Sequence, residues 1–243
     1  MRRTEEPEDP RRRLLVRALA LGALAAGMPK DARPQGLLGS RPGRLPPGRS
    51  IHRIEGEAFV NDRAAGLATP IAPGDTVRTA PGGEIAFVVG GHAMLARGAT
   101  TVVIERGGQD ESFALRGLRL LSGALLSVSR DSRFRLRTTM ATIGIRGTGF
   151  YAEAEPDRTY FCTCYGTTDV ESDADPASRE TIEAKYHDRP VYIVKDAPAG
   201  RAIRTAPFIN HTADELALVE ALVGREPPFL FSRESYGGPR RRY

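Results

Sequence analysis

Cysteine and histidine are the residues of this sequence that could do chemistry together. Cys162 and Cys164, the only two cysteines, lie two positions apart in a strand-like run, Thr159–Tyr165. Because successive side chains of a strand point to opposite faces, we expect both thiols on one face. Two thiolates on one face can chelate a soft metal such as zinc or copper, and His187 and His211 would complete a tetrahedral set.

Other interpretations of these four residues stay open. Cα atoms two residues apart on a strand are about 6.5–7 Å apart, and their roughly parallel Cβ vectors suit a mutual disulfide poorly. An oxidising compartment could still produce a strained or intermolecular disulfide. The cysteines could equally be small core residues, with the histidines in turns or at the surface. No ligand pair has zinc-ribbon spacing, and we expect His52 and His92 to lie farther from the cysteines than His187 does.

The sequence contains no recognisable catalytic motif. It has no Gly-x-Ser-x-Gly, no His-Glu-x-x-His and no phosphate-binding loop. The run Gly144–Gly149 is rich in glycine, but strand-like residues follow it, whereas a phosphate cradle needs a helix N-terminus there. Close packing of strands therefore explains these glycines better, and we expect a protein that is not an enzyme.

The elements that must position the cysteines are predicted to be strands. Turn signals such as Asn61-Asp62, Pro73-Gly74 and Pro81-Gly82 separate short apolar runs. Strand starts recur about every 8–11 residues. This pattern predicts an all-β fold of short antiparallel strands, but by itself it does not distinguish a solenoid or roll from a sandwich or barrel.

One strand-like run has a dry face and a strongly basic face. Phe134, Leu136 and Thr138 alternate with arginines at 133, 135 and 137. Such alternation is typical of a strand with one buried and one solvated face.

One helix is predicted near residues 213–223. Thr212 and Glu215 have the spacing of a capping box, and Gly224 suits the position after the helix end. The apolar stripe consists of Leu216, Val219, Leu222 and Val223. We expect this stripe to pack against the β domain, with a partner-binding helix as the alternative.

The first residues resemble an export signal. Arginines at 11–13 precede an apolar run, and Ala23-Leu24-Ala25 supplies a small-x-small cleavage site. We expect export by a Tat-like or Sec route and a periplasmic protein. An amphipathic helix in a cytosolic protein is the alternative. The run is interrupted by Arg17 and is short of the roughly 20 apolar residues of a membrane span, so no stable span is expected after cleavage.

The predicted organisation has four segments. These are an export signal at 1–25, a Pro/Gly/Arg-rich linker at 26–50, a β domain at 51–172 and a C-terminal extension at 173–243 that carries the helix. The formal net charge is +5 over 243 residues. Much of the basic excess is near the chain ends, where basic residues usually promote solubility, so no nucleic-acid partner is expected.

Three runs of the sequence resemble the FecR domain family. The hallmark run matches at Thr139, Ala141, Ile143, Ile145, Arg146, Gly147, Thr148 and Phe150, with Met140 where the family usually has proline. Two further runs, Pro73–Thr79 and Leu118–Leu126, occur in the expected order. The resemblance implies a twisted all-β solenoid-like stack of hairpins. It also implies kinship with the periplasmic part of iron-uptake regulators, which pass a signal from an outer-membrane transporter to a cytoplasmic sigma factor.

The whole signalling role is not expected to carry over. The residues before Leu14 are too few for a cytoplasmic anti-sigma domain. We therefore expect a non-catalytic periplasmic interaction or signal-sensing module whose partner is an envelope or outer-membrane protein. The alternative is a metal-binding or redox protein that uses Cys162, Cys164, His187 and His211. A weaker alternative is an enzyme acting on envelope polymers, for which no paired carboxylates are evident.

Overall fold

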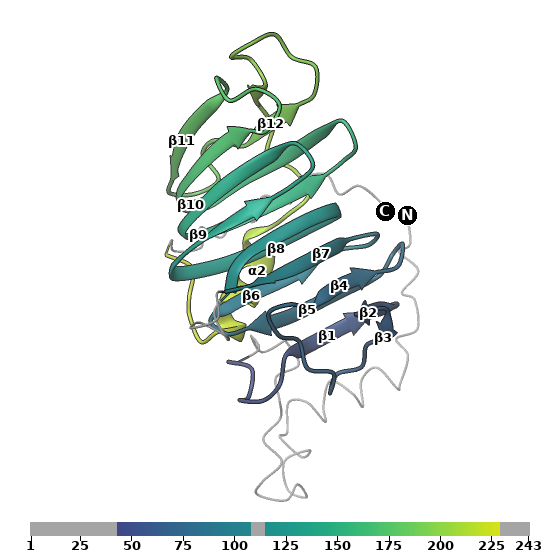
Figure 1. Ribbon diagram of the computed structural model, residues 1–243. Coiled ribbons are helices and arrows are strands. Elements are labelled where there is room, and N and C mark those ends of the chain that lie inside the picture. The colour runs from purple at the N-terminus through teal and green to yellow at the C-terminus, as the bar shows by residue number, and fades with distance from the viewer. Residues whose placement is uncertain (1–42, 108–114, 229–243) are drawn as a thin grey trace, which may run out of the picture. The chain divides into compact units, whose positions relative to one another are not determined.

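The computed structural model describes residues 43–107 and 115–228 (Figure 1). The predicted export signal and most of the predicted linker lie outside these residues. The division into four segments therefore stays a prediction.

Within the described residues, the chain forms one 13-stranded antiparallel sheet and one α-helix. The strands are β1 (Ile51–Glu55), β2 (Ala58–Val60), β3 (Arg63–Ala64), β4 (Thr76–Thr79), β5 (Glu84–Val89), β6 (His92–Ala96), β7 (Thr101–Arg106), β8 (Leu115–Arg137), β9 (Ala141–Ala154), β10 (Arg158–Ser172), β11 (Arg179–Ala184), β12 (Val191–Val194) and β13 (Ile203–Thr205). The helix is α2 (Ala213–Leu222). The predicted all-β class with a short C-terminal helix is confirmed.

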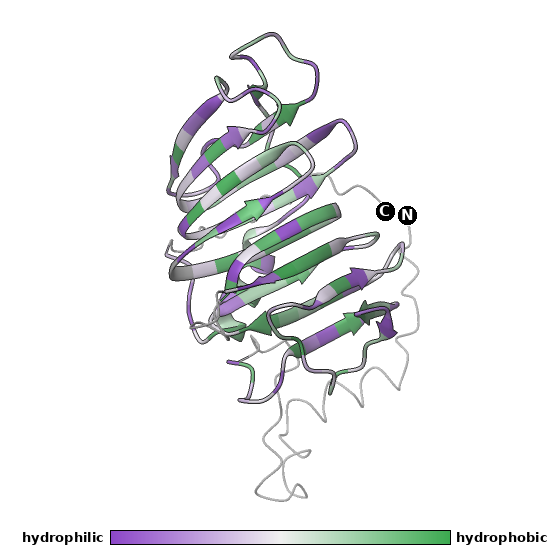
Figure 2. Cartoon of the chain, in the orientation of Figure 1, coloured by the Kyte–Doolittle hydropathy of each residue, from purple (hydrophilic) through white to green (hydrophobic). Residues whose placement is uncertain are grey.

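Neighbouring strands of the sheet are mostly neighbours in sequence. The main path runs β13-β12-β10-β9-β8-β7-β4-β2-β3, while β11 pairs with β10, and β1, β5 and β6 join through β8. In Figure 1 the strands lie side by side as successive rungs, with α2 behind β6 and β8. Figure 2 shows β5 as largely hydrophobic, whereas β11 is largely hydrophilic.

Three strands are longer than the sequence pattern indicates. Residues 124–128 and 133–137 both belong to the single strand β8, which pairs with β9 from Gly123 to Arg137. Register shifts lie between Ser129 and Arg133 in β8 and on either side of Tyr165 in β10. Such bulges let a strand bend while it stays paired, so one long bent strand replaces two short ones.

Each long strand is buried differently in its two halves. All residues of 124–129 in β8, 148–154 in β9 and 159–165 in β10 are buried, and we call these segments together the covered half. In the other half, exposed and buried residues alternate along 133–137 of β8. The covered half therefore has a packed layer on both faces, since burial of every residue needs cover on both sides of a sheet.

Helix α2 and the residues beside it supply the second layer. The capping box is present, because the Thr212 hydroxyl accepts from the Glu215 backbone N–H and the Glu215 carboxylate accepts from the Thr212 N–H. Leu216, Val219 and Leu222 are buried in a second hydrophobic cluster that includes residues of β6, β8, β9 and β10. The helix therefore packs against the sheet, as the apolar stripe predicts. No described helix has the length and apolar character that a membrane crossing requires.

Candidate metal centre

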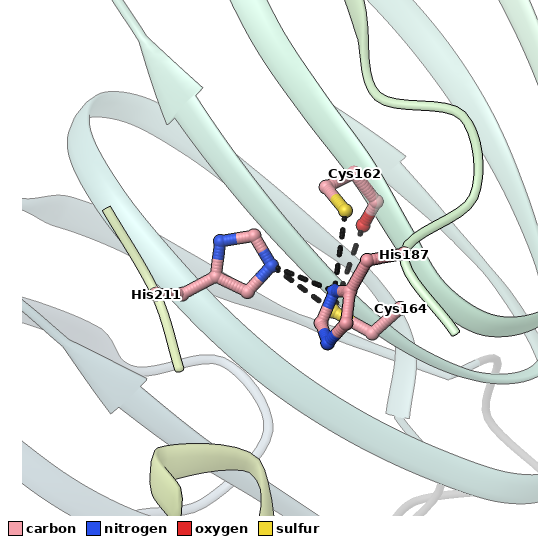
Figure 3. A group of neighbouring side chains, drawn as sticks. All are labelled: Cys162, Cys164, His187 and His211. Atoms are coloured by element: carbon pink, nitrogen blue, oxygen red, sulfur yellow. Dashed lines mark hydrogen bonds between the residues drawn. The ribbon is translucent and has the colours of Figure 1, made fainter. Parts of the chain in front are cut away.

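The structure brings the four predicted ligands together within the second hydrophobic cluster (Figure 3). Cys162 and Cys164 lie on β10, His187 lies in the turn after β11, and His211 immediately precedes the cap of α2. One ligand atom from each residue lies within 4.8 Å of the other three, and all four side chains are buried. Both cysteines are free thiols.

A tight turn aims His187 at the cysteines. His187 has a φ of 52°, a left-handed conformation that is uncommon outside glycine. The Asp188 carboxylate accepts hydrogen bonds from the Lys185 and Tyr186 N–H groups, and the His187 N–H donates to the Cys164 carbonyl at 3.0 Å. The turn is thus fixed directly to β10, and His187 Nδ1 lies 3.5 Å from Cys162 Sγ.

His211 is oriented by its own backbone and by Tyr151. Its Nδ1–H donates to the Ile209 carbonyl at 2.8 Å, and its ring stacks on Tyr151 with centroids 4.4 Å apart. This hydrogen bond fixes the tautomer, so that Nε2 carries the free lone pair. Nε2 lies 3.5 Å from Cys164 Sγ and 3.1 Å from His187 Nδ1.

These separations suit a tetrahedral ion. With Zn–S of about 2.3 Å and Zn–N of about 2.0–2.1 Å, a sulfur and a nitrogen ligand lie about 3.5 Å apart, and two nitrogens about 3.3 Å apart. The Sγ–N separations are 3.5 Å for both Cys–His pairs, and the two nitrogens are 3.1 Å apart. The donor set and these three separations therefore fit zinc or another soft ion, and the widest of the other pairs, at 4.8 Å or less, would close on binding.

Burial favours the uncharged forms of the Cys164, His187 and His211 side chains. Desolvation, followed by the hydrogen bond and charge of Cys162, raises the pKa of the Cys164 thiol well above its ordinary value. Desolvation lowers the pKa of His187 to about 4, and together with the nearby His187 it lowers the pKa of His211. Neutral imidazole is the form that ligates a metal, whereas the Cys164 thiol must first lose its proton, so metal binding releases protons.

A buried polar network behind the centre is not evident from the sequence. Glu153 of β9 is 3% exposed and accepts hydrogen bonds from the Tyr151 hydroxyl at 2.8 Å and from Asn210 Nδ2 at 2.5 Å. Asn210, with a φ of 61°, directly precedes His211. Glu153 therefore fixes the backbone that presents His211. Its one sequence signal is a charged residue between two alanines, in the otherwise apolar run 149–154.

The other two histidines lie outside the centre. His52 is in β1, and His92 begins β6, where its ring meets Phe134 edge-on at 5.3 Å. Neither belongs to the group of ligand atoms formed by the cysteines, His187 and His211.

The fold and the four converging side chains together define an all-β protein with a buried Cys/His cluster. Catalytic zinc sites keep a coordination position open for water or substrate, whereas structural sites fill all four with protein ligands. Two thiols and two imidazoles would fill all four positions here.

Residues 75–167 match the family model described as FecR protein, which confirms the resemblance to the FecR domain family over β4 to β10. Both cysteines lie within the matched segment, and His187 and His211 lie beyond it.

Two crystal structures of a protein from Parabacteroides distasonis ATCC 8503, described as a "putative anti-sigma factor", are similar to this chain with TM-scores of 0.42. The identities are 14% and 15%, and each similarity covers 54% of this chain and 58% of the other. The similarity thus spans little more than half of those chains. No curated protein matches the chain.

Proposed function

We propose that the protein is a non-catalytic FecR-type interaction or signal-sensing module whose C-terminal segment is held to the β domain by one soft metal ion. The observation that carries the metal assignment is the convergence of four buried ligand atoms, from three separate segments, within 4.8 Å of one another. Zinc is the first choice, because two thiolates and two imidazoles suit its tetrahedral preference, and copper(I) is the alternative.

The ion would join parts of the chain that are far apart in sequence. Cys162 and His187 are separated by 25 residues, and Cys164 and His211 by 47. Because His211 directly precedes the cap of α2, an ion bound there would hold the helix over β10. Metal binding would in this way stabilise the packing of helix α2 and the residues beside it against the sheet.

Metal analysis of the full chain, purified without chelator, tests this assignment. We expect close to one equivalent of zinc or copper, as for a structural site. We expect less than about a tenth of an equivalent in His211→Gln and in the double variant Cys162→Ser/Cys164→Ser. His52→Gln is the matched control and keeps the metal. A wild-type protein that neither contains a soft metal nor takes up zinc or copper(I) would reduce the four residues to packing.

The interaction role is supported by the FecR segment and by a centre in which four protein side chains would fill every coordination position of a tetrahedral ion. We propose a periplasmic protein whose partner is an envelope or outer-membrane protein. Cell fractionation with N-terminal sequencing tests the compartment: we expect cleavage near Ala25, by the small-x-small rule, and loss of export by the Tat route in Arg12→Lys/Arg13→Lys. An uncleaved cytosolic protein would overturn both the compartment and the envelope partner.

A further inference from the structure

The uncovered half of the sheet carries a concentration of arginines. Arg133, Arg135 and Arg137 are exposed on β8 and alternate with buried Phe134 and Leu136. Together with Arg116 of β8 and Arg146 of β9, they line a hollow of ≈ 380 Å³. We call these five arginines the arginine face. The hollow also contains two carboxylates, those of Glu105 and Asp169.

The positive charge of this face is only partly compensated. Arg146 is paired with Asp169, and Arg137 lies 3.9 Å from Glu105. Among the side chains that the structure describes, which leave out those of 108–114 and 130–132, Arg116, Arg133 and Arg135 have no ion-pair partner. Arg133 is also directly opposite Arg146 on the neighbouring strand, and like charges in that position destabilise a sheet. This arrangement is unfavourable alone and becomes favourable when an anion lies between the guanidinium groups.

The floor of the hollow is open for such an anion. Gly144 lies opposite Arg135 and presents no side chain. A Cβ built at Gly144 meets nothing closer than Asp169 at 3.5 Å, which is an ordinary contact. Position 144 therefore tolerates a side chain, so substitutions there can test whether binding needs this space to be open.

We propose that the arginine face binds a ligand that carries phosphoryl groups. Arginines two apart on a strand are spaced by about 6.5–7 Å, and directly opposed residues by about 4.5–5.5 Å, so each phosphoryl group can contact two guanidinium groups. The three oxygens of a phosphoryl group accept from several such forks, whereas a lone carboxylate is satisfied by one. The ligand is either a soluble phosphorylated compound or a phosphate-bearing lipid headgroup.

This inference is independent of the proposed function, because the arginine face shares no residue with the metal centre. Every variant below is checked for its metal content. A variant that loses phosphoryl binding with unchanged metal content therefore separates the two sites.

Titration of the full chain with inorganic pyrophosphate at low salt tests whether the ligand is a soluble phosphorylated compound. Binding to vesicles of phosphatidylglycerol in phosphatidylcholine, compared with binding to phosphatidylcholine alone, tests whether the ligand is a lipid headgroup. We expect Arg133→Gln/Arg135→Gln to weaken binding at least tenfold. Arg63→Gln/Arg204→Gln, which removes the same charge from exposed residues of β3 and β13, is expected to bind like wild type. Binding should weaken as salt rises, because these groups are solvent-exposed.

Gly144 provides a second test that keeps every arginine. Gly144→Glu places a carboxylate in the hollow and is expected to weaken binding at least tenfold, whereas Gly144→Ala retains it. Binding of pyrophosphate identifies a soluble ligand, and binding only of phosphatidylglycerol vesicles identifies a lipid headgroup. Equal binding of a glutamate-rich peptide overturns the phosphoryl assignment. Equal affinities of the two arginine double variants would show that the ligand does not bind at the arginine face. If the protein binds neither probe, the proposal is overturned.

Discussion

The two halves of strands β8–β10 differ in what lies over them. In the covered half, every residue of 148–154 and 159–165 is buried, including Cys162 and Cys164. In the other half, buried residues of the same strands are interspersed with partly or fully exposed ones, which include the arginine face. The difference shows that the C-terminal segment, rather than the strands themselves, decides which part of the sheet has two dry faces.

Polar groups behave differently on the two sides of this boundary. Under the C-terminal segment, two buried carboxylates have partners: Glu220 accepts from the Tyr165 hydroxyl and from Arg225, and Glu153 accepts from Asn210. On the uncovered half, charge is exposed and partly uncompensated. A buried polar group requires a partner, whereas an exposed one is solvated by water. The first half therefore suits a fixed centre and the second suits reversible binding.

The largest expected effect is loss of the contact between α2 and the sheet. Leu216→Ala removes a side chain that is 0% exposed and should lower the free energy of unfolding by about 2–5 kcal/mol, through lost burial and a cavity. Leu121→Ala, at a leucine that is 43% exposed, should change it by less than about 0.5 kcal/mol. Urea unfolding measures both, and equal effects would contradict a tightly packed second layer.

Gly147 lies at the junction of the two halves of β9 and has a φ of 62°. Gly147→Val should lower the free energy of unfolding by about 2–4 kcal/mol, because a β-branched residue is strained at positive φ. Thermal unfolding measures the effect, with Gly144→Ala as a control at a glycine of ordinary φ. An unchanged melting temperature together with lost ligand binding would instead indicate that Gly147 contacts a ligand.

Zinc should stabilise the covered half selectively. At a free zinc concentration about 100 times the Kd, binding to the folded state alone adds about 2.7 kcal/mol. Hydrogen exchange should slow around His187 and His211 and change little around 133–137. His211→Gln should abolish the effect, and uniform slowing over both halves would argue against a local site.

The shifted pKa of His92 should make the stability of the protein depend on pH. Burial, followed by the charge of Arg225, lowers the pKa of His92 to about 4. The folded state then binds fewer protons than the unfolded state between about pH 6.5 and 4. The contribution of His92 is thus fully present above pH 6.5 and is lost as the pH falls through this window. Over this pH range, the free energy of unfolding of His92→Gln should fall by up to about 3 kcal/mol less than that of the wild type. Parallel pH profiles would contradict a neutral, buried His92.

The smallest expected effect has the opposite sign. Arg133→Gln relieves the repulsion with Arg146 and should raise the free energy of unfolding by about 0.2–1 kcal/mol at low salt. The gain should shrink at high salt, where exposed charges are screened. Urea unfolding at two salt concentrations measures it, and destabilisation at low salt would show that Arg133 has a stabilising partner.

Local features of the sequence were sufficient to predict the cap of α2 and the faces of strands β8 and β10. The spacing of Thr212 and Glu215 predicts the cap of α2, and alternation at 133–137 predicts the dry and basic faces of β8. The two-residue spacing of Cys162 and Cys164 places both thiols on one face of β10. These features depend on neighbours within a few residues, which the backbone geometry of a helix or strand fixes.

Tertiary structure alone decided the site and the length of the strands. His187 and His211 reach the cysteines because the chain turns back at Asp188, after β11, and because Glu153 holds Asn210. Apart from the charged Glu153 between two alanines, neither path has a local signal in the sequence. The covered half lost its alternation because both of its faces are buried, and a period of two appears only where one face of a sheet meets water.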